Sequence, residues 1–334
     1  MPRHKRIEIE GGIYHVIQRG LERREIFRDD SDRQEFINRL SLGLKQIGHK
    51  CYGWVLMPNH FHLLIRTGER SLSDLMRKLL TGYAIYFNRK YERNGYLYQN
   101  RYKSILCQQD NYLLELVRYI HLNPLRAKIV EDINGLNKYK WSGHGVLVGE
   151  NKAEWQSTGE ILEHFGGKKS KAVIKYIEFI SEAKDKGNRD DLSGGGLRRS
   201  AGGWEEVKAL KMMKDYWRGD ERILGDGDFV NEVLRVSEEI MKKRELLKRE
   251  GWDINRLTEH VAKIIGITKD EILKKRKHNK AMRAKGLISY WGRQKLGLNG
   301  KQIGDFLGIT KQAVSYLVMC GEKLVKEKNY NLSI

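Results

Sequence analysis

Two histidines stand two residues apart in the segment Met57-Pro-Asn-His-Phe-His-Leu-Leu-Ile65. Side chains alternate along a strand, so His60 and His62 project from one face while Phe61 and Leu63 turn to the other, into a core. Two neutral imidazoles side by side supply half of a metal site. The other interpretation is an exposed pair that bonds only to water or backbone, and the His-x-His spacing alone leaves both open.

A tyrosine and an asparagine are four residues apart in the segment Leu116-Val-Arg-Tyr-Ile-His-Leu-Asn-Pro-Leu-Arg126. In a helix this spacing places Tyr119 and Asn123 on one face, where a nucleophile and a metal-binding oxygen can lie side by side. Asn123 before Pro124 also suits the start of a following helix, and Tyr119 also suits a core position. For His121, on another face of the helix, we expect a structural role.

Together these segments resemble a known family. The Met-Pro-Asn-His60-Phe-His62 and Tyr119-Ile-His-Leu-Asn-Pro-Leu-Arg126 blocks are similar to motifs of the IS200-like Y1 transposases of the HUH superfamily, most of all the REP-associated tyrosine transposases. Further blocks of the resemblance are Gly12-Ile-Tyr-His-Val-Ile-Gln-Arg-Gly20, Gly95-Tyr-Leu-Tyr-Gln-Asn-Arg-Tyr-Lys103 and Lys140-Trp-Ser142. The ordered set covers residues 1 to about 150 and is more specific than any single motif.

The resemblance implies cleavage and strand transfer of single-stranded DNA at palindromic or hairpin elements. In such proteins a tyrosine attacks the scissile phosphorus, leaving a 5′-phosphotyrosine and a free 3′-OH, and a Mg²⁺ or Mn²⁺ ion polarises the phosphate. Carried over, Tyr119 is the nucleophile, His60 and His62 are metal ligands, and Asn123 is the third ligand. The chemistry is coherent, because a cation offsets the negative charge of the phosphodiester and a phenol is a weak nucleophile without help.

The elements that position these residues are predicted from periodicity and turn signals. Residues 1–150 predict an α+β domain, a central antiparallel sheet flanked by helices, as in the HUH (ferredoxin-like) transposase fold. We expect strands at 12–19, 51–57 and 61–65, and helices at 32–44, 72–91 and 112–122. Residues 151–203 predict a linker or irregular segment, with a Gly-rich stretch at 191–203. Residues 204–334 predict a mainly α-helical region.

A helix-turn-helix is predicted at about 301–318. Gly308 suits the turn and Thr310 suits the N-cap of the second helix. The positions that then face outward, where a recognition helix meets DNA, are Lys311, Gln312, Ser315 and Tyr316. Residues 261–296 resemble the C-terminal domain of the replication initiator DnaA, which carries a basic run here at Lys274-Lys275-Arg276-Lys277.

The charge of the chain favours a nucleic-acid partner. The 334 residues carry 63 Lys and Arg against 43 Asp and Glu, a formal net charge of +20. From His260 to Ile334 there are 16 basic and 5 acidic residues, an excess of 11. In the first 150 residues, the family blocks offer further cations for DNA contact: Arg19, Arg101, Lys103 and Arg126. From composition alone, the alternative interpretation is a basic surface with no particular partner.

Other features of the sequence argue against a membrane protein, a secreted protein and a disulfide-bonded protein. No run of about 18 apolar residues predicts a membrane span, and the basic N-terminus lacks the apolar run of a signal peptide. Three scattered cysteines argue against a disulfide framework or a cysteine metal site, so we expect a cytoplasmic, nucleoid-associated protein. The resemblance leaves monomer and homodimer open.

Three functions remain after these observations. The first is an active metal-dependent tyrosine transposase, which the presence of Tyr119, His60 and His62 together favours. The second is a non-catalytic regulator that binds a DNA sequence or hairpin. The third is a metal-dependent phosphohydrolase without a covalent intermediate.

Overall fold

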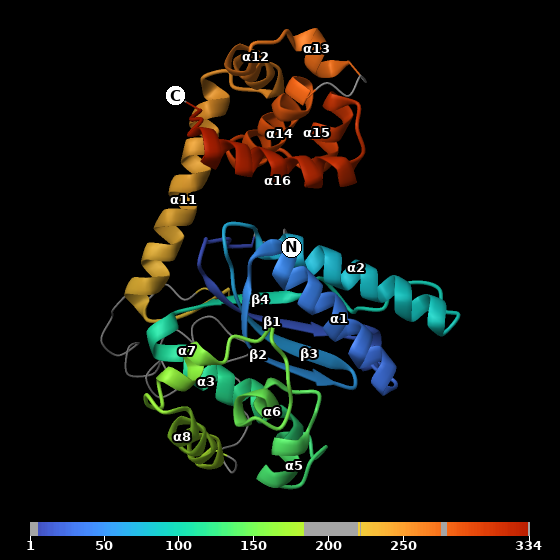
Figure 1. Cartoon of the computed structure of the whole chain (residues 1–334), viewed down its shortest axis with the longest axis vertical. Helices are drawn as coiled ribbons and strands as arrows, with labels where there is room; N and C mark the ends of the chain where they lie inside the picture. Colours follow the sequence, from blue (N-terminus) through green and yellow to red (C-terminus); the bar gives the residue numbers. More distant parts are fainter. Residues whose placement is uncertain (1–5, 184–219, 221, 275–278, 333–334) are drawn as a thin grey trace. The chain divides into compact units, whose positions relative to one another are not determined.

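The chain divides into two compact units, Met1–Leu234 and Arg235–Ile334. The computed structural model describes residues 6–183, 220, 222–274 and 279–332, and each unit is treated by itself (Figure 1). The Gly-rich stretch at 191–203, expected as a linker, lies outside the described residues. In the described part of the chain, no helix is both long and apolar enough to cross a membrane.

The first unit is built on a five-stranded sheet with the order β2-β3-β1-β4-β5. Its strands are β1 (Ile13–Arg19), β2 (Lys50–Met57), β3 (His60–Arg66), β4 (Lys103–Cys107) and β5 (Ile223–Leu224). The first four pair antiparallel, as predicted, and β5 pairs parallel with β4, which makes the whole sheet mixed. Strand β4 and the short β5 were not expected from the sequence.

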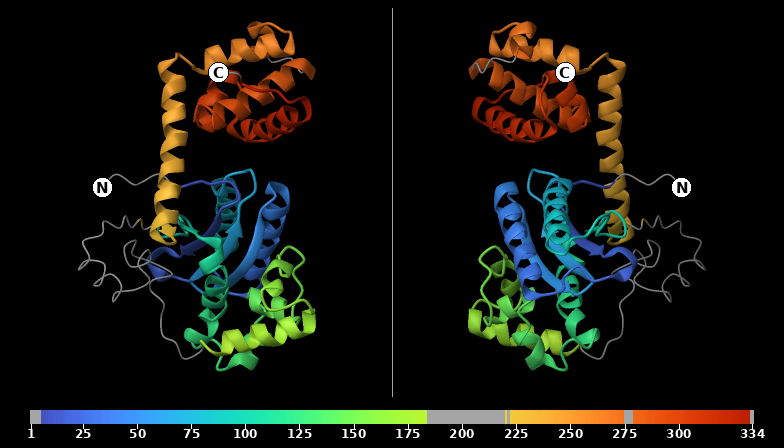
Figure 2. Two further views of the ribbon diagram at one scale, coloured as in Figure 1. Left: turned by 90° about the vertical axis from the view of Figure 1, so that its left-hand side faces the viewer. Right: turned by 90° about the vertical axis from the view of Figure 1, so that its right-hand side faces the viewer.

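Helices cover both faces of this sheet (Figures 1 and 2). Helices α1 (Asp30–Ile47) and α2 (Leu72–Lys90) pack on one face, where a core cluster contains the strand residues Val16, Phe61 and Leu63. Helix α3 (Gln109–His121) packs on the other face, against a second cluster that includes Leu64 and Ile105. Alternation along the strands explains the split, because neighbouring residues face opposite layers. The expected α+β architecture is therefore confirmed.

The helix boundaries follow from local capping. Asp29 caps α1 and accepts from the backbone N–H of Asp32, while Gly48 ends that helix in the left-handed region with φ 77°. Ser71 caps α2 in the same way. The remaining short helices of residues 1–150 are η1 (Leu21–Arg23), α4 (Asn123–Arg126), α5 (Ile133–Lys138) and α6 (Gly143–Val148).

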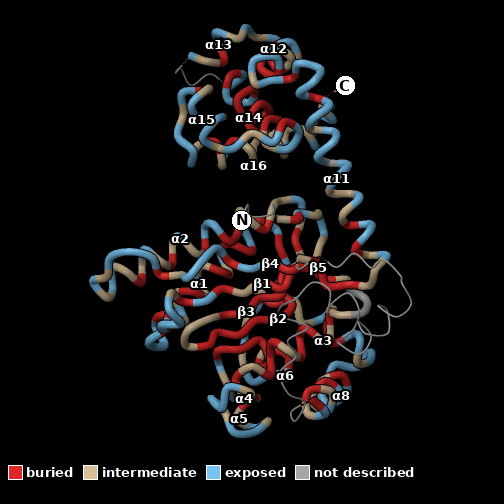
Figure 3. The backbone as a smooth tube through the Cα atoms, turned by 180° about the vertical axis from the view of Figure 1, so that it is seen from behind, coloured by how far each residue is buried: buried red, intermediate tan, exposed pale blue. Residues whose placement is uncertain are grey.

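The segment after residue 150 is more ordered than a linker in its described part. It forms α7 (Gly159–Glu163) and α8 (Lys169–Ser181), and buried residues of both helices belong to the core beneath α3. Tyr176 of α8 is fully buried there and bonds to two histidines, His121 and His144. Figure 3 shows this burial in red along the central strands and along part of α8. The structural role expected for His121 agrees with this buried position.

The second unit is helical. It contains the C-terminal part of α11 (Gly227–Arg249) and then α12 (Ile254–Ile265), α13 (Lys269–Leu273), α14 (Asn279–Gln294), α15 (Gly300–Leu307) and α16 (Lys311–Lys328). The predicted start of the second helix is reproduced, because Thr310 accepts from the backbone N–H of Ala313. Gly308 ends α15 with φ 64°. Helix α16 is longer than the sequence pattern predicted.

Candidate active site

The two candidate metal-binding histidines lie on β3, on the face of the sheet that α3 covers. Their ring centroids are 5.2 Å apart. Imidazole nitrogens bind divalent ions at roughly 2 Å, so two rings on one ion have centroids about 5 Å apart. His60 is half-buried and His62 is only 4% exposed. The separation and shared face fit two nitrogen ligands of one ion.

Burial keeps both histidines neutral. Desolvation, with the charge of Arg19 as a second cause, lowers the pKa of His60 to about 4. Desolvation also holds the pKa of His62 well below its usual range, with smaller contributions from His15, His60 and Arg19. A neutral imidazole has a lone pair for a metal and an imidazolium has none. Near pH 7 both rings are therefore in the form that can bind a cation.

A third histidine, His15 on β1, belongs to the same cluster. The sequence predicted no role for it beyond its place in the family-like block at residues 12–20. Its ring stacks on His62 at 5.1 Å, and its Nε2 lies 2.9 Å from Nδ1 of His62. His15 is fully buried. The signal in the sequence was its spacing: His15, Ile17 and Arg19 lie at alternate positions and so share one face of a strand. The register of β1 and β3 puts that face together with the face of His60 and His62.

Tyr119 approaches these rings from α3. Its ring centroid is 5.8 Å from those of His15 and His62, at interplanar angles of 75° and 79°. The guanidinium carbon of Arg126 lies 5.3 Å from the centroid of the Tyr119 ring. Tyr112 lies two helical turns earlier, about 10 Å along the axis, and so occupies a different level of the helix. The tyrosine expected from the sequence is thus adjacent to the histidines.

Asn123 is the first residue of α4, one residue beyond the C-cap of α3, and its side chain bonds to the last turn of α3. Its Nδ2 donates to the carbonyl oxygens of Tyr119 and Ile120, at 2.9 and 3.2 Å. This differs from the expected N-cap of a following helix, since the N-cap of α4 is Leu122 and Asn123 is already its first residue. With the nitrogen bonded to backbone, Oδ1 is the atom of this amide that suits a cation. Among the described residues, no group of three or more His, Cys, Asp and Glu side chains has metal-site geometry.

The turn that leads into His60 is fastened by the segment before α1. The carbonyl oxygen of Pro58 accepts from the N–H groups of Ile26 and Phe27, and the N–H of Gly20 donates to the carbonyl of Asn59. Ile26 and Phe27 are both buried. The turn is therefore positioned by a second chain segment as well as by its own strands.

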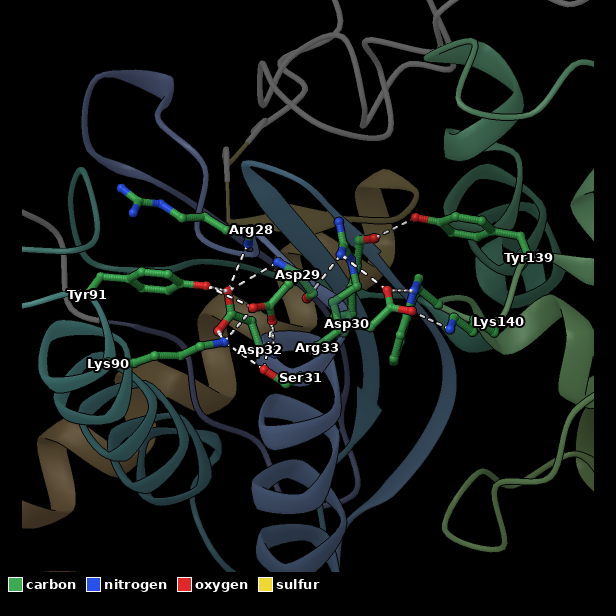
Figure 4. Close-up of polar contacts among 12 residues, drawn as sticks. Arg28, Asp29, Asp30, Ser31, Asp32, Arg33, Lys90, Tyr91, Tyr139 and Lys140 are labelled. Atoms are coloured by element: carbon green, nitrogen blue, oxygen red, sulfur yellow. Dashed lines mark hydrogen bonds and ion pairs between the residues drawn. The ribbon is translucent and has the colours of Figure 1, made fainter.

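A polar cluster at the start of α1 holds that segment (Figure 4). Lys90 bridges Asp29 and Asp32 at 2.7 and 2.8 Å, and Asp32 is fully buried. Asp32 also accepts from the N–H of Arg28 at 2.8 Å and from the hydroxyl of Tyr91 at 2.8 Å. These bonds satisfy a buried carboxylate and join α1 to the end of α2. The cluster is structural support for the segment that carries Ile26 and Phe27.

Basic side chains predicted to contact DNA share the histidine face or lie near it. Arg19 pairs with His60 across the sheet, and Lys103 is the cross-strand partner of Ile17, which itself pairs with His62. Arg19, Arg101 and Lys103 are exposed. Because directly paired residues share a face, Arg19 and Lys103 place positive charge beside the two histidines.

In the second unit the candidate DNA-binding residues lie at two places. Lys311, Gln312 and Tyr316 are exposed in the first two turns of α16, whereas Ser315 is half-buried and donates to the carbonyl of Lys311. Lys274 is exposed at the end of α13, and the rest of its basic run, Lys275, Arg276 and Lys277, lies outside the described residues.

Comparisons with known proteins agree with the family resemblance over part of the chain. No curated protein matches it at a significant level. A solved structure described as a REP-associated tyrosine transposase bound to a REP hairpin is 15% identical, and the alignment covers 47% of this chain and 98% of that one at a TM-score of 0.38. Because that TM-score is low, the structural match supports no conclusion about the family, and only the sequence comparison bears on it. Residues 9–123, which lie in the first unit, match the model of the family described as "Transposase IS200 like".

Proposed function

We propose that this protein cleaves and rejoins single-stranded DNA beside hairpin elements, using Tyr119 as the nucleophile and a divalent ion held by His60, His62 and Asn123. The observation that carries the proposal is the position of Tyr119, whose ring is 5.8 Å from that of His62 on the face of the sheet that carries both histidines. The family match over residues 9–123, which includes all four residues, supports the same chemistry.

The proposed step is a transesterification. The phenolic oxygen of Tyr119 forms a bond to the scissile phosphorus and loses its proton to solvent or a nearby base. The bond from phosphorus to the 3′-oxygen breaks, and that oxygen takes a proton to become a free 3′-OH. The 5′ side of the cut stays on Tyr119 as a phosphodiester, so rejoining needs no nucleotide cofactor.

The ion, Mg²⁺ or Mn²⁺, would supply Lewis-acid polarisation of a nonbridging phosphate oxygen. The protein contributes what surrounds it. His60 and His62 offer neutral nitrogens, and Arg126 over the Tyr119 ring places positive charge near a developing phenolate. Arg19 and Lys103 supply exposed cations for the phosphates of the substrate strand.

The second unit is proposed to bind DNA through the start of α16. Lys311, Gln312 and Tyr316 are exposed in its first two turns, where recognition helices contact base edges and phosphates. Deletion of residues 260–334 should weaken hairpin or duplex binding and flatten its salt dependence, because fewer counterions are released. An unchanged affinity and salt slope would assign this unit to a structural or protein-binding role.

Denaturing gels test the cleavage. A hairpin oligonucleotide with single-stranded flanks, labelled at its 3′ end, should yield a labelled protein adduct with Mn²⁺ or Mg²⁺ and none in EDTA. Tyr119→Phe should bind the oligonucleotide with nearly wild-type affinity but form no adduct, because the ring packing remains and the attacking oxygen is lost. Tyr112→Phe is the matched control and should retain the adduct.

The alternatives give different results in the same assay. Adduct formation by Tyr119→Phe, or a nucleotide mapped to Tyr112 by mass spectrometry, would contradict the assignment. Cleavage by the wild type without any adduct would indicate a metal-dependent hydrolase. Tight binding without cleavage would indicate a non-catalytic regulator. His60→Ala and His62→Ala should each abolish cleavage while the circular dichroism spectrum is unchanged.

A further inference from the structure

The hydrogen bonds of the turn before β3 determine which nitrogen of His60 carries its proton. Nδ1 of His60 lies 2.6 Å from Oδ1 of Asn59, and Nδ2 of Asn59 donates to the carbonyl oxygen of Arg23 over 3.1 Å. A carbonyl only accepts, so the amide nitrogen must face Arg23 and the amide oxygen must face the imidazole. His60 therefore donates from Nδ1, and its Nε2 keeps the lone pair.

The accepting carbonyl of Arg23 is itself held in an unusual backbone conformation. Glu22 and Arg23 have φ values of 54° and 61°, in the left-handed region that residues with a side chain seldom adopt. Such strain persists where the surroundings fix it. Here Gly20 packs so closely that a Cβ would lie 2.1 Å from the carbonyl oxygen of Arg24. In this conformation the loop places the carbonyl of Arg23 beside Asn59.

His62 has an equivalent partner in a neighbouring strand. Its Nδ1 is bonded at 2.9 Å to Nε2 of His15, in a part of the sheet where both rings are buried. The pair has two arrangements, with the shared hydrogen on either residue. Only when His62 donates from Nδ1 does its own Nε2 carry a lone pair, and His15 then accepts through Nε2 and carries its hydrogen on Nδ1.

We propose that Asn59 and His15 are positioning residues that hold His60 and His62 as the Nδ1–H tautomer, so that both Nε2 atoms are ready for a divalent ion. This role rests on the proposed function, because the tautomer matters only if an ion binds, but the tautomer itself can be measured without any ion or DNA. Metal-binding histidines commonly donate their second ring nitrogen to such a partner, which fixes ring orientation and tautomer. Of the two arrangements of the His15–His62 pair, we infer that His15 holds the one in which His62 donates from Nδ1, because that one leaves Nε2 of His62 able to bind the ion.

The tautomers can be read directly in the metal-free protein. We would label the full chain with ¹⁵N-histidine and record long-range ¹H–¹⁵N correlations near pH 7, where a protonated and an unprotonated ring nitrogen resonate far apart. His60 and His62 should both appear as Nδ1–H. Asn59→Leu should convert His60 to the Nε2–H form that free histidine prefers, while Asn59→Asp, which keeps an accepting oxygen, should preserve Nδ1–H.

The second pair has its own matched variants. His15→Phe keeps an aromatic ring but removes the acceptor, so His62 should change to Nε2–H, whereas His15→Gln offers an amide oxygen and should preserve Nδ1–H. The second readout is Mn²⁺ affinity by electron paramagnetic resonance. Asn59→Leu and His15→Phe should each weaken it about 10- to 100-fold, with Asn59→Asp and His15→Gln closer to wild type.

The possible results separate the inference from the proposed function. If His60 is Nε2–H in the wild type, or if it stays Nδ1–H in Asn59→Leu, the role of Asn59 is overturned whatever the protein does to DNA. The same criterion applies to His62 and His15→Phe. If all tautomers respond as expected and the wild type nevertheless binds no Mn²⁺, the positioning stands and the metal-dependent function is wrong.

Discussion

The crossing of α14 and α16 gives a sharp test of how the second unit is held together. At this crossing two glycines meet, and a Cβ on Gly321 would lie 2.1 Å from the carbonyl oxygen of Gly286 and 2.4 Å from its carbonyl carbon. Nonbonded heavy atoms pack at about 3.5 Å, so Gly321→Ala must separate the two helices by roughly 1.4 Å. Both obstructing atoms are backbone, which has no rotamer to change.

Two effects of Gly321→Ala oppose each other. Alanine is favoured over glycine inside a helix by about 1 kcal/mol. Overpacking in a tight core costs about 1–3 kcal/mol, and a backbone clash belongs at the upper end of that range. We expect a net loss of about 2 kcal/mol, which corresponds to a roughly 30-fold larger opening constant for these helices.

Hydrogen exchange followed by mass spectrometry of the full chain measures this effect locally. Peptides from α14 and α16 should lose about 30-fold in protection, while peptides from the first unit should not change. Gly300→Ala is the matched control, because its Cβ would meet only the flexible side chain of Lys311, at 3.3 Å, and should leave protection equal or slightly higher. Unchanged protection in Gly321→Ala would refute the close crossing, and with it the placement of α16.

Three further predictions concern buried polarity and DNA contact. Burial lowers the pKa of His144 to about 4, so the stability that its neutral form contributes is fully present above pH 6.5 and is lost as the pH falls toward 4. Urea titrations should show about 3 kcal/mol less stability at pH 4 than at pH 7 from this group, and His144→Gln should show a smaller loss. Tyr176→Phe should cost about 2–4 kcal/mol in urea at pH 7, because it leaves Nδ1 of both His121 and His144 without their shared hydroxyl; a neutral effect would disprove that network. Lys311→Ala should lower the salt slope of DNA binding by about 1. Lys323→Ala is the control and should leave the slope unchanged, because Lys323 lies farther along α16, where its side chain is 77% exposed and paired with Glu327. Equal slopes for the two variants would argue against the start of α16 as the DNA-contacting part.

Residue patterns within single elements could be predicted from the sequence. The alternation of His60, Phe61 and His62 predicted one strand with two chemically different faces, and β3 has them. Tyr119 was predicted on a helix, and the apolar spacing that buries Leu116 and Ile120 also turns its ring toward the sheet. Gly308 and Thr310 marked the turn between α15 and α16, because capping and left-handed turns depend on a few adjacent residues.

Contacts between distant segments were decided only by the tertiary structure. The two-residue strand β5 and helix α8, which buries Ala172, Tyr176 and Ile180, extend the first unit well beyond the expected boundary near residue 150. Both pack against elements distant in the sequence: β5 pairs with β4, and the buried face of α8 belongs to the core cluster of α3. The spacing of His15 from Arg19 placed both on one face of a strand, but the pairing of His15 with His62, 47 residues away, depended on the fold. Asn59 stood next to His60 in the sequence throughout, yet only the carbonyl of Arg23, brought to it by a strained loop, fixes the direction of its amide. Local sequence thus determined which residues can do chemistry. The hydrogen-bond partners that orient them come together only when strands and loops far apart in the chain are packed. The reason is that a hydrogen bond requires a defined distance and direction, which no spacing in the sequence can specify.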